Sequence, residues 1–253
     1  MNYENNNLEN QTPEENAKLI IDFFHRISMH HAIWFAEVSE KLGKVKAYEI
    51  LDKVYKQSYD VQMKRLSKIM GFEMKDSLPS GLTNLPNEKL LELREGVALN
   101  WLANDGIWFQ AIEFSSGMAD AKHCNDASWA QFAPFEAWSI KRNLNLTEFP
   151  GLDGLKQALK MRMYSFINKQ SVIEETANSF VFQMDDCRVQ STRKRKGLDD
   201  YPCKSAGIIE FPEFAKAIDS RIKTECVCCP PDEHPESHFC AWKFSIDTTF
   251  INL

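Results

Sequence analysis

Cysteines are the residues of this chain whose type and spacing point most directly to a chemistry. Six of the seven lie towards the end of the sequence: Cys187, Cys203, Cys226, Cys228, Cys229 and Cys240. Cys226 and Cys229 form a C-x-x-C pair, a spacing that lets two thiolates converge on one metal ion or cluster. A proline follows Cys229, as it follows the last cysteine of the bacterial iron–sulfur run.

The spacing predicts a metal centre with four thiolate ligands. We expect the ligands to be Cys203, Cys226, Cys229 and Cys240, with Cys187 and Cys228 as alternates. Zinc would make a closed tetrahedral site that stabilises the second half of the chain. A [4Fe–4S] cluster needs the same four thiolates and would add redox or Lewis-acid chemistry. The sequence leaves the choice between zinc and iron–sulfur open.

Two other uses of these residues compete with the metal centre. In the first, Cys187 or Cys228 is a nucleophile that Arg188, His234 or His238 activates. In the second, the metal is structural and the protein is a non-catalytic sensor or accessory protein for a small molecule. Basic side chains that would attract an anionic ligand lie nearby: Arg188, Arg193, Lys194, Arg195, Lys196 and Lys204.

Composition and charge exclude several classes of protein. Hydrophobic residues make up 43% of the 253 residues and charged residues 26%, as in a globular protein. The net charge of −6 argues against a general nucleic-acid partner. No apolar run approaches the length of about 20 residues that spans a membrane, and residues 1–12 resemble a disordered tail rather than a secretory signal. A cytoplasmic location follows, where thiols stay reduced. The sequence is also compatible with a homodimer.

The elements that position the cysteines begin with an internal repeat. Residues 31–72 align without a gap on residues 105–146 at a constant offset of 74. The matching residues include Ile33-Trp34-Phe35 with Ile107-Trp108-Phe109, Gly43 with Gly117, and Asp52 with Asp126. Each copy has apolar residues at helical spacing on both sides of its glycine. The pattern predicts two helical hairpins, each broken at a glycine C-cap and together forming a four-helix unit.

A second metal site in this helical half is the less favoured interpretation of its acidic residues. A di-iron bundle needs Glu-x-x-His on two helices, and neither copy contains this motif. Asp52 and Asp126 are the only carboxylates that match across the repeat. We therefore expect them to cap a helix or form ion pairs.

The pattern changes after Pro150. Residues 151–160 predict a short helix, and a second helix is expected to begin near Phe211 with Pro212 in its first turn. Residues 163–173, 180–184 and 242–246 are rich in β-forming or alternating residues and predict strands. The chain is thus expected to be α+β, with a duplicated helical-hairpin domain at residues 13–149 and a cysteine-rich α+β domain with a small antiparallel sheet at 150–253.

Three stretches resemble a known group of proteins. They are residues 100–129, which begin Asn100-Trp101-Leu102; residues 186–198, which begin Asp186-Cys187-Arg188; and residues 201–244, which contain Cys229-Pro230-Pro231-Asp232. Together they resemble an uncharacterised family of bacterial and archaeal cytosolic proteins. That family is related to the L-2-amino-thiazoline-4-carboxylic acid hydrolase-like proteins and, more remotely, to vinyl-4-reductase-type small-molecule-binding domains. The first copy of the repeat departs from the pattern, with His31-Ala32 where the second has Asp105-Gly106.

The resemblance implies a small α+β ligand-binding domain with cysteines at its edge and, in some relatives, hydrolysis of a small ring compound. We therefore expect a metal-binding enzyme that hydrolyses or otherwise transforms a small anionic or sulfur-containing compound. The catalytic candidates are Asp105, Glu113, Cys187 and Arg188.

Overall fold

A computed structural model describes residues 11–247 and divides the chain into two compact units, residues 1–84 and 85–253. The predicted tail lies almost wholly outside the described residues, and its Thr12 is the N-cap of the first helix. Across residues 11–247, no helix has the length and apolar character needed to cross a membrane. The predicted α+β class is confirmed, because helices dominate both units and a small antiparallel sheet lies in the C-terminal part.

The first unit is a long helical hairpin followed by a two-stranded sheet and a short helix. Its elements are α1 (Pro13–Leu42), α2 (Lys44–Met70), β1 (Met74–Lys75), β2 (Leu78–Pro79) and α3 (Ser80–Thr83). Thr12 and Glu15 form a capping box that begins α1. Gly43 separates α1 from α2 with φ of 82°, a conformation that glycine adopts without the steric cost of a Cβ.

The second repeat copy forms the corresponding hairpin in the second unit. Helices α4 (Asn87–Ser116) and α5 (Met118–Asn143) meet at Gly117, whose φ is 94°. Both predicted hairpins are therefore confirmed, with their glycines at the breaks. The matched carboxylates make ordinary contacts: Asp52 pairs with Lys56 at 3.2 Å, and Asp126 accepts a hydrogen bond from Ser205 at 3.1 Å.

The sheet contains four strands in the order β3-β4-β6-β5, and every neighbouring pair is antiparallel. The strands are β3 (Lys169–Ile173), β4 (Ser179–Asp186), β5 (Ile222–Cys228) and β6 (Cys240–Ile246). The three predicted strands are confirmed as β3, β4 and β6, and β3 pairs with β4. Residues 163–166, expected to be extended, instead form a short 3₁₀ helix, η2 (Met163–Phe166).

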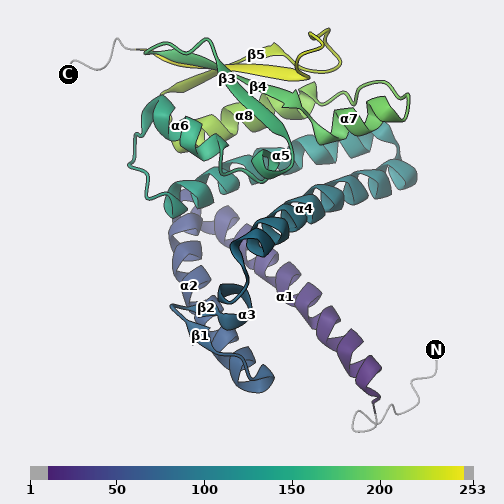
Figure 1. Cartoon of the computed structure of the whole chain (residues 1–253), viewed down its shortest axis with the longest axis vertical. Coiled ribbons are helices and arrows are strands. Elements are labelled where there is room, and N and C mark those ends of the chain that lie inside the picture. The colour runs from purple at the N-terminus through teal and green to yellow at the C-terminus, as the bar shows by residue number, and fades with distance from the viewer. Residues whose placement is uncertain (1–10, 248–253) are drawn as a thin grey trace. The chain divides into compact units, whose positions relative to one another are not determined.

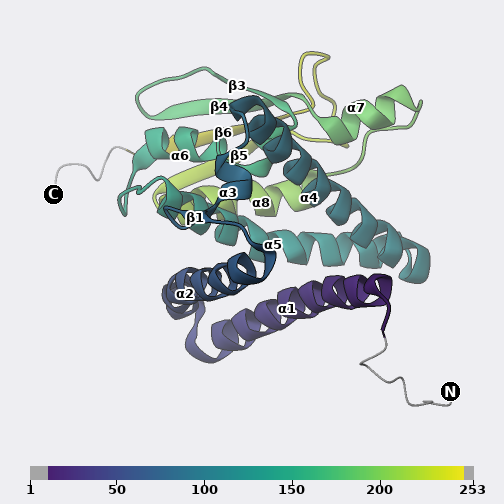
Figure 2. The ribbon, with the colours of Figure 1, turned by 60° about the horizontal axis from the view of Figure 1, so that its bottom comes forward.

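Helices cover one face of this sheet, which we call the inner face (Figures 1 and 2). They are α6 (Gly151–Leu159) and α8 (Lys204–Ile218), with α5 packed behind them. Helix α7 (Arg188–Arg195) follows β4 at the end of the sheet. The inner core includes Leu155 from α6, Phe214 from α8 and Trp242 from β6. The predicted boundary at 149/150 thus falls within the second unit, because α5 shares a core with α8.

Helix α8 begins earlier than the sequence predicted. Its first residue is Lys204, and Pro212 lies in its interior instead of its first turn. An interior proline removes one backbone hydrogen bond and costs about 3 kcal/mol. Burial of Phe211, Phe214 and Ile218 against the sheet opposes this cost. Proline alone is therefore a poor marker of the start of a buried helix.

Candidate functional site

A β-bulge at the end of β5 decides where the cysteines of the C-x-C-C run point. Cys226 pairs with Trp242 across the sheet, but Cys228 pairs with Ala241, so Val227 is an extra residue. Cys226 therefore shares the inner face with Trp242, while Cys228 packs with Val181 and Ala241 on the outer face. Cys229 returns to the inner core. The bulge divides the run between the two faces of the sheet.

Five cysteines lie at the inner core, and we call four of them, which come from separate elements, the inner thiol cluster: Cys187, Cys203, Cys229 and Cys240. The Sγ atoms of Cys203 and Cys229 lie 3.7 Å apart. Cys240, the first residue of β6, interacts through its thiol with Cys229. Cys187 lies between β4 and α7, and its thiol is influenced by those of Cys203 and Cys240.

A buried glutamine holds Cys203 in place. The side chain of Gln190, on α7, is 1% exposed and donates from Nε2 to Cys203 Sγ at 3.5 Å. Gln190 also donates to the carbonyl of Tyr201 and accepts from its backbone N–H, both at 2.8 Å. Cys203 itself is the N-cap residue of α8. Gln190 therefore joins α7 to the segment that presents Cys203.

The cluster contains thiols of very different acidity. Hydrogen bonds from Cys229 and Gln190 lower the pKa of Cys203, although burial opposes them. The hydrogen bond with Cys203 raises the pKa of Cys229, and burial adds to this effect. Burial raises the pKa of Cys187 to about 12. Cys203 is thus more easily ionised than Cys187 or Cys229, and Cys187 is not poised as an activated nucleophile.

The other two predicted ligands lie in different surroundings. Cys226 is half-buried on the inner face, where its neighbours include Lys204 and Asp232, which form an ion pair at 2.7 Å. Cys228 is buried on the outer face and its Sγ lies 3.5 Å from Nε2 of His238. The other ring nitrogen of His238 lies 3.0 Å from Ser237 Oγ and 3.2 Å from Gln183 Nε2. Cys228 therefore belongs to a thiol–imidazole pair and not to the inner thiol cluster.

Of the predicted catalytic residues outside the cysteines, Asp105 has the clearest link to the inner thiol cluster. Its charge acts on Tyr201, which is two residues from Cys203. Burial raises the pKa of its carboxyl, and its charge acts on both Tyr164 and Tyr201. Glu113 also acts on Tyr201. The Arg188 side chain is exposed, although its backbone N–H donates to Asn168 Oδ1 at 2.8 Å. Asp105 is thus half-buried and acts on two tyrosines, whereas Arg188 lies at the surface.

His234 closes the loop beside the cluster. Its Nε2 lies 2.9 Å from Asp200 Oδ2, and its Nδ1 lies 2.9 Å from the carbonyl oxygen of Pro235. Both neighbours are acceptors, so the ring satisfies both contacts only when both nitrogens carry protons. The hydrogen bond to Asp200 raises the pKa of His234. This histidine therefore links the β5–β6 loop to the segment before α8.

No group of three or more His, Cys, Asp or Glu side chains within residues 11–247 already has the arrangement that holds a metal ion. The seven cysteines are all free thiols. A metal centre would therefore require the thiols of the inner cluster to turn towards a common point.

Residues 83–246 match a family of unknown function, DUF6125. The chain belongs to this family. The DUF6125 match spans α4 to β6 and contains all seven cysteines, whereas α1 and α2 lie outside it. No curated protein and no solved structure matches the chain. The expected kinship with the hydrolase-like proteins therefore stays a prediction.

Sequence reasoning missed Gln190 and Tyr201, which support Cys203. The available signal was helical spacing: Gln190 is three residues after Cys187, and residues three apart on a helix share a face. Arg188 was instead predicted to be catalytic, because it is charged and adjacent to Cys187. A buried neutral amide gives no such signal in the sequence.

Proposed function

We propose that the protein binds a thiophilic metal centre, zinc or an iron–sulfur cluster, through the inner thiol cluster and uses it in a reaction on a small molecule. The observation that carries this proposal is the approach of Cys203 to Cys229, at 3.7 Å between sulfur atoms. Two thiolates bound tetrahedrally to one zinc at about 2.3 Å have their sulfurs about 3.8 Å apart. This pair already has the separation that two ligands of one ion require.

The ligand set favoured by the packing is Cys187, Cys203, Cys229 and Cys240. Cys187 is influenced by two other members, Cys203 and Cys240. Cys226, in the set predicted from spacing, is influenced first among charged groups by Lys204 and Asp232, which form an ion pair with each other. Cys187 is therefore the better fourth ligand, and Cys226 the alternative. Metal binding would release the protons of these thiols, including the one now shared between Cys203 and Cys229.

An enzymatic role requires a proton-transfer group beside the centre, and Asp105 is the best candidate. Its carboxyl lies among Tyr164 and Tyr201, and Tyr201 is two residues from Cys203. Desolvation raises the pKa of this half-buried carboxyl, the direction that favours a role as a general acid. Hydrolysis of a small anionic or sulfur-containing compound in the cytoplasm remains the proposed reaction class. A non-catalytic sensor with a structural metal is the alternative.

Metal content and absorption of the protein purified without oxygen test the proposal. We expect either one zinc per chain or the broad absorption near 400 nm that marks thiolate-bound iron–sulfur centres. The Cys229→Ser variant should lose the metal, whereas Cys228→Ser, a change at the next residue on the opposite face, should keep it. Absence of metal from the wild-type protein after zinc addition and after anaerobic cluster reconstitution would reject the centre. Equal loss from both variants would reject the ligand assignment.

The Cys228–His238 contact favours a second candidate function, thiol catalysis without metal. In the neutral ring, Nδ1 of His238 accepts from Gln183 Nε2, so the ring proton is on Nε2, which faces the Cys228 sulfur at 3.5 Å. Once the thiol has lost its proton to water, Nε2–H can donate to the thiolate that attacks an electrophile. Burial raises the pKa of Cys228, so this hydrogen bond is needed to favour the thiolate. If this candidate holds, iodoacetamide should label Cys228 of the wild-type protein at least about tenfold faster than Cys228 of the His238→Gln variant. Equal rates would reject it.

A further inference from the structure

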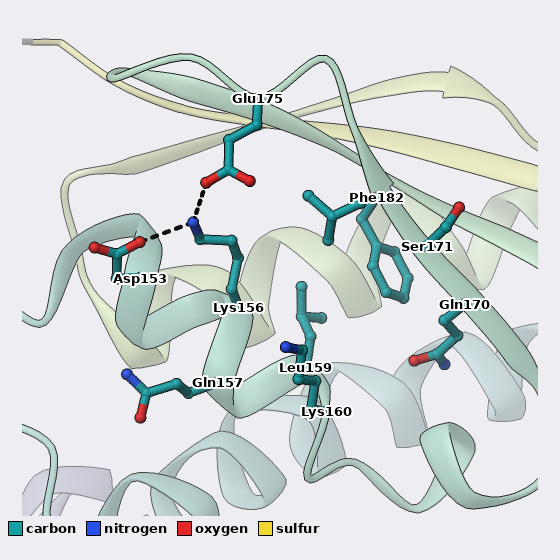
Figure 3. Close-up of a pocket in the computed structure, with 10 residues that line it drawn as sticks. Asp153, Lys156, Gln157, Leu159, Lys160, Gln170, Ser171, Glu175 and Phe182 are labelled. Carbon is teal, nitrogen blue, oxygen red and sulfur yellow. Dashed lines mark hydrogen bonds and ion pairs between the residues drawn. The ribbon is translucent and has the colours of Figure 1, made fainter.

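A pocket on the second unit lies between helix α6 and the edge strand β3, away from the cysteines (Figure 3). Its volume is about 600 Å³, within the range of small-molecule sites. Helix α6 contributes Asp153, Lys156, Gln157 and Leu159, and its C-cap residue is Lys160. The sheet contributes Gln170, Ser171, Val172 and Phe182, and Glu175 comes from the β3–β4 turn. The pocket is therefore built by rigid elements on two sides.

Charge is unevenly distributed around this pocket. At one end, Lys156 lies between two carboxylates, at 2.8 Å from Asp153 and in a shorter contact with Glu175 (Figure 3). Two carboxylates and one ammonium leave this end with an excess negative charge. Lys160 is the remaining cation of the lining, and it is exposed. The pocket thus offers a negative end and a separate positive group.

The surface between these charges can accept an apolar group and still form hydrogen bonds. Phe182 is 3% exposed and Leu159 is 2% exposed, so they form a fixed apolar floor. Gln157, Gln170 and Ser171 add neutral hydrogen-bonding groups around it. This combination of an apolar floor and a few polar groups is typical of small-molecule sites.

We propose that this pocket binds a free amino acid or a closely similar zwitterion with an apolar side chain. The ammonium group of the ligand would face Asp153 and Glu175, its carboxylate would face Lys160, and its side chain would pack on Phe182. Opposite charges at two points orient such a ligand, and a molecule that lacks either group leaves one end of the pocket unmatched. This proposal is independent of the metal centre.

Binding of leucine, methionine and phenylalanine to the full chain, measured by ligand-observed NMR, tests the proposal. At least one should bind, and two analogues of the best binder should each bind about tenfold more weakly. One analogue lacks the ammonium and the other lacks the carboxylate; for leucine they are 4-methylpentanoate and 3-methylbutylamine. Failure of all three amino acids to bind, or an analogue that binds as tightly as the amino acid it is derived from, overturns the proposal.

Two variants test the orientation of the ligand. Lys160→Met should weaken binding of the amino acid about tenfold and leave binding of the amine analogue unchanged. Glu175→Gln should weaken binding of the amine analogue and leave binding of the carboxylate analogue unchanged. Lys169→Met is the matched control for Lys160, because Lys169 is exposed on β3 and does not line the pocket. An amino acid that binds Lys160→Met as tightly as the wild-type protein overturns the assignment.

Discussion

Cys203 and Cys229 are 26 residues apart in the chain, yet their sulfur atoms lie 3.7 Å apart in the inner core. This contact predicts a preferred disulfide as well as a metal site. Diamide, which takes two hydrogens from a pair of thiols, should link Cys203 to Cys229, because Cys203 is the most easily ionised thiol of the pair. Peptide mapping by mass spectrometry checks the linkage.

The same oxidation provides a control for ligand identity. Cys228 lies on the opposite face of the sheet, so its linkage to Cys203 should be absent from the map. Protein loaded with zinc should resist diamide, because a metal-bound thiolate is protected from exchange. Rapid linkage of Cys203 to Cys229 in the presence of one bound zinc per chain would contradict their assignment as ligands.

Gly207 tests the packing around the cluster. A Cβ added there would lie 2.7 Å from Cζ2 of Trp242, a buried ring that has no room to move. The Gly207→Ala variant should lose about 1–3 kcal/mol of unfolding free energy from overpacking. Urea denaturation measures this loss.

Gly96 is the matched control for Gly207. It lies inside helix α4, and a Cβ added there would meet no atom within 4 Å. Gly96→Ala should therefore raise the unfolding free energy by up to about 1 kcal/mol, because alanine is the better helix former. Similar effects at both positions would show that the contact with Trp242 does not constrain the helix.

The buried ion triad of Arg162 with Glu136 and Glu210 should be essential for folding stability. Arg162 is 2% exposed, and its side chain donates to Glu136 at 2.8 Å and to Glu210 at 2.6 Å. Arg162→Met leaves two buried carboxylates without a cation and should cost about 3–5 kcal/mol. Urea denaturation provides the measurement. Arg195→Met, at an exposed arginine of α7, is the control and should change stability by about 0.5 kcal/mol or less.

The hydrogen bond between His234 and Asp200 predicts that the stability of the protein depends on pH. The hydrogen bond to Asp200 raises the pKa of His234 above its usual value of 6.5. A group with a raised pKa in the folded state stabilises that state fully below its unfolded pKa, and this contribution is lost as the pH rises through the folded pKa. The wild-type protein should therefore have a higher Tm than His234→Gln at pH 6, with a difference that shrinks as the pH increases.

Thermal unfolding followed from pH 6 to pH 9 checks this dependence. Asp200→Asn is the complementary variant, because it removes the acceptor and keeps the histidine. Its Tm should approach that of the wild-type protein over the same pH range. A Tm difference that stays constant with pH would show that the protonation state of His234 does not contribute to stability.

The sequence by itself determined the local elements of this protein. Apolar residues at helical spacing and the glycines at 43 and 117 were enough to predict both helical hairpins, because helix periodicity and glycine conformation are local properties. Alternation likewise predicted β3, β4 and β6. The cysteine spacing predicted that Cys203, Cys229 and Cys240 lie in one neighbourhood, and the packing of the inner core agrees.

The tertiary structure decided which face each residue occupies. One extra residue at Val227 sends Cys228 outwards and returns Cys229 to the core, since each residue added to a strand reverses the direction of the next side chain. A bulge depends on the pairing of β5 with β6, which no local pattern records. The same holds for Cys187 and Gln190, which join the cluster only because α7 packs beside Cys203, and for the charged pocket between α6 and β3.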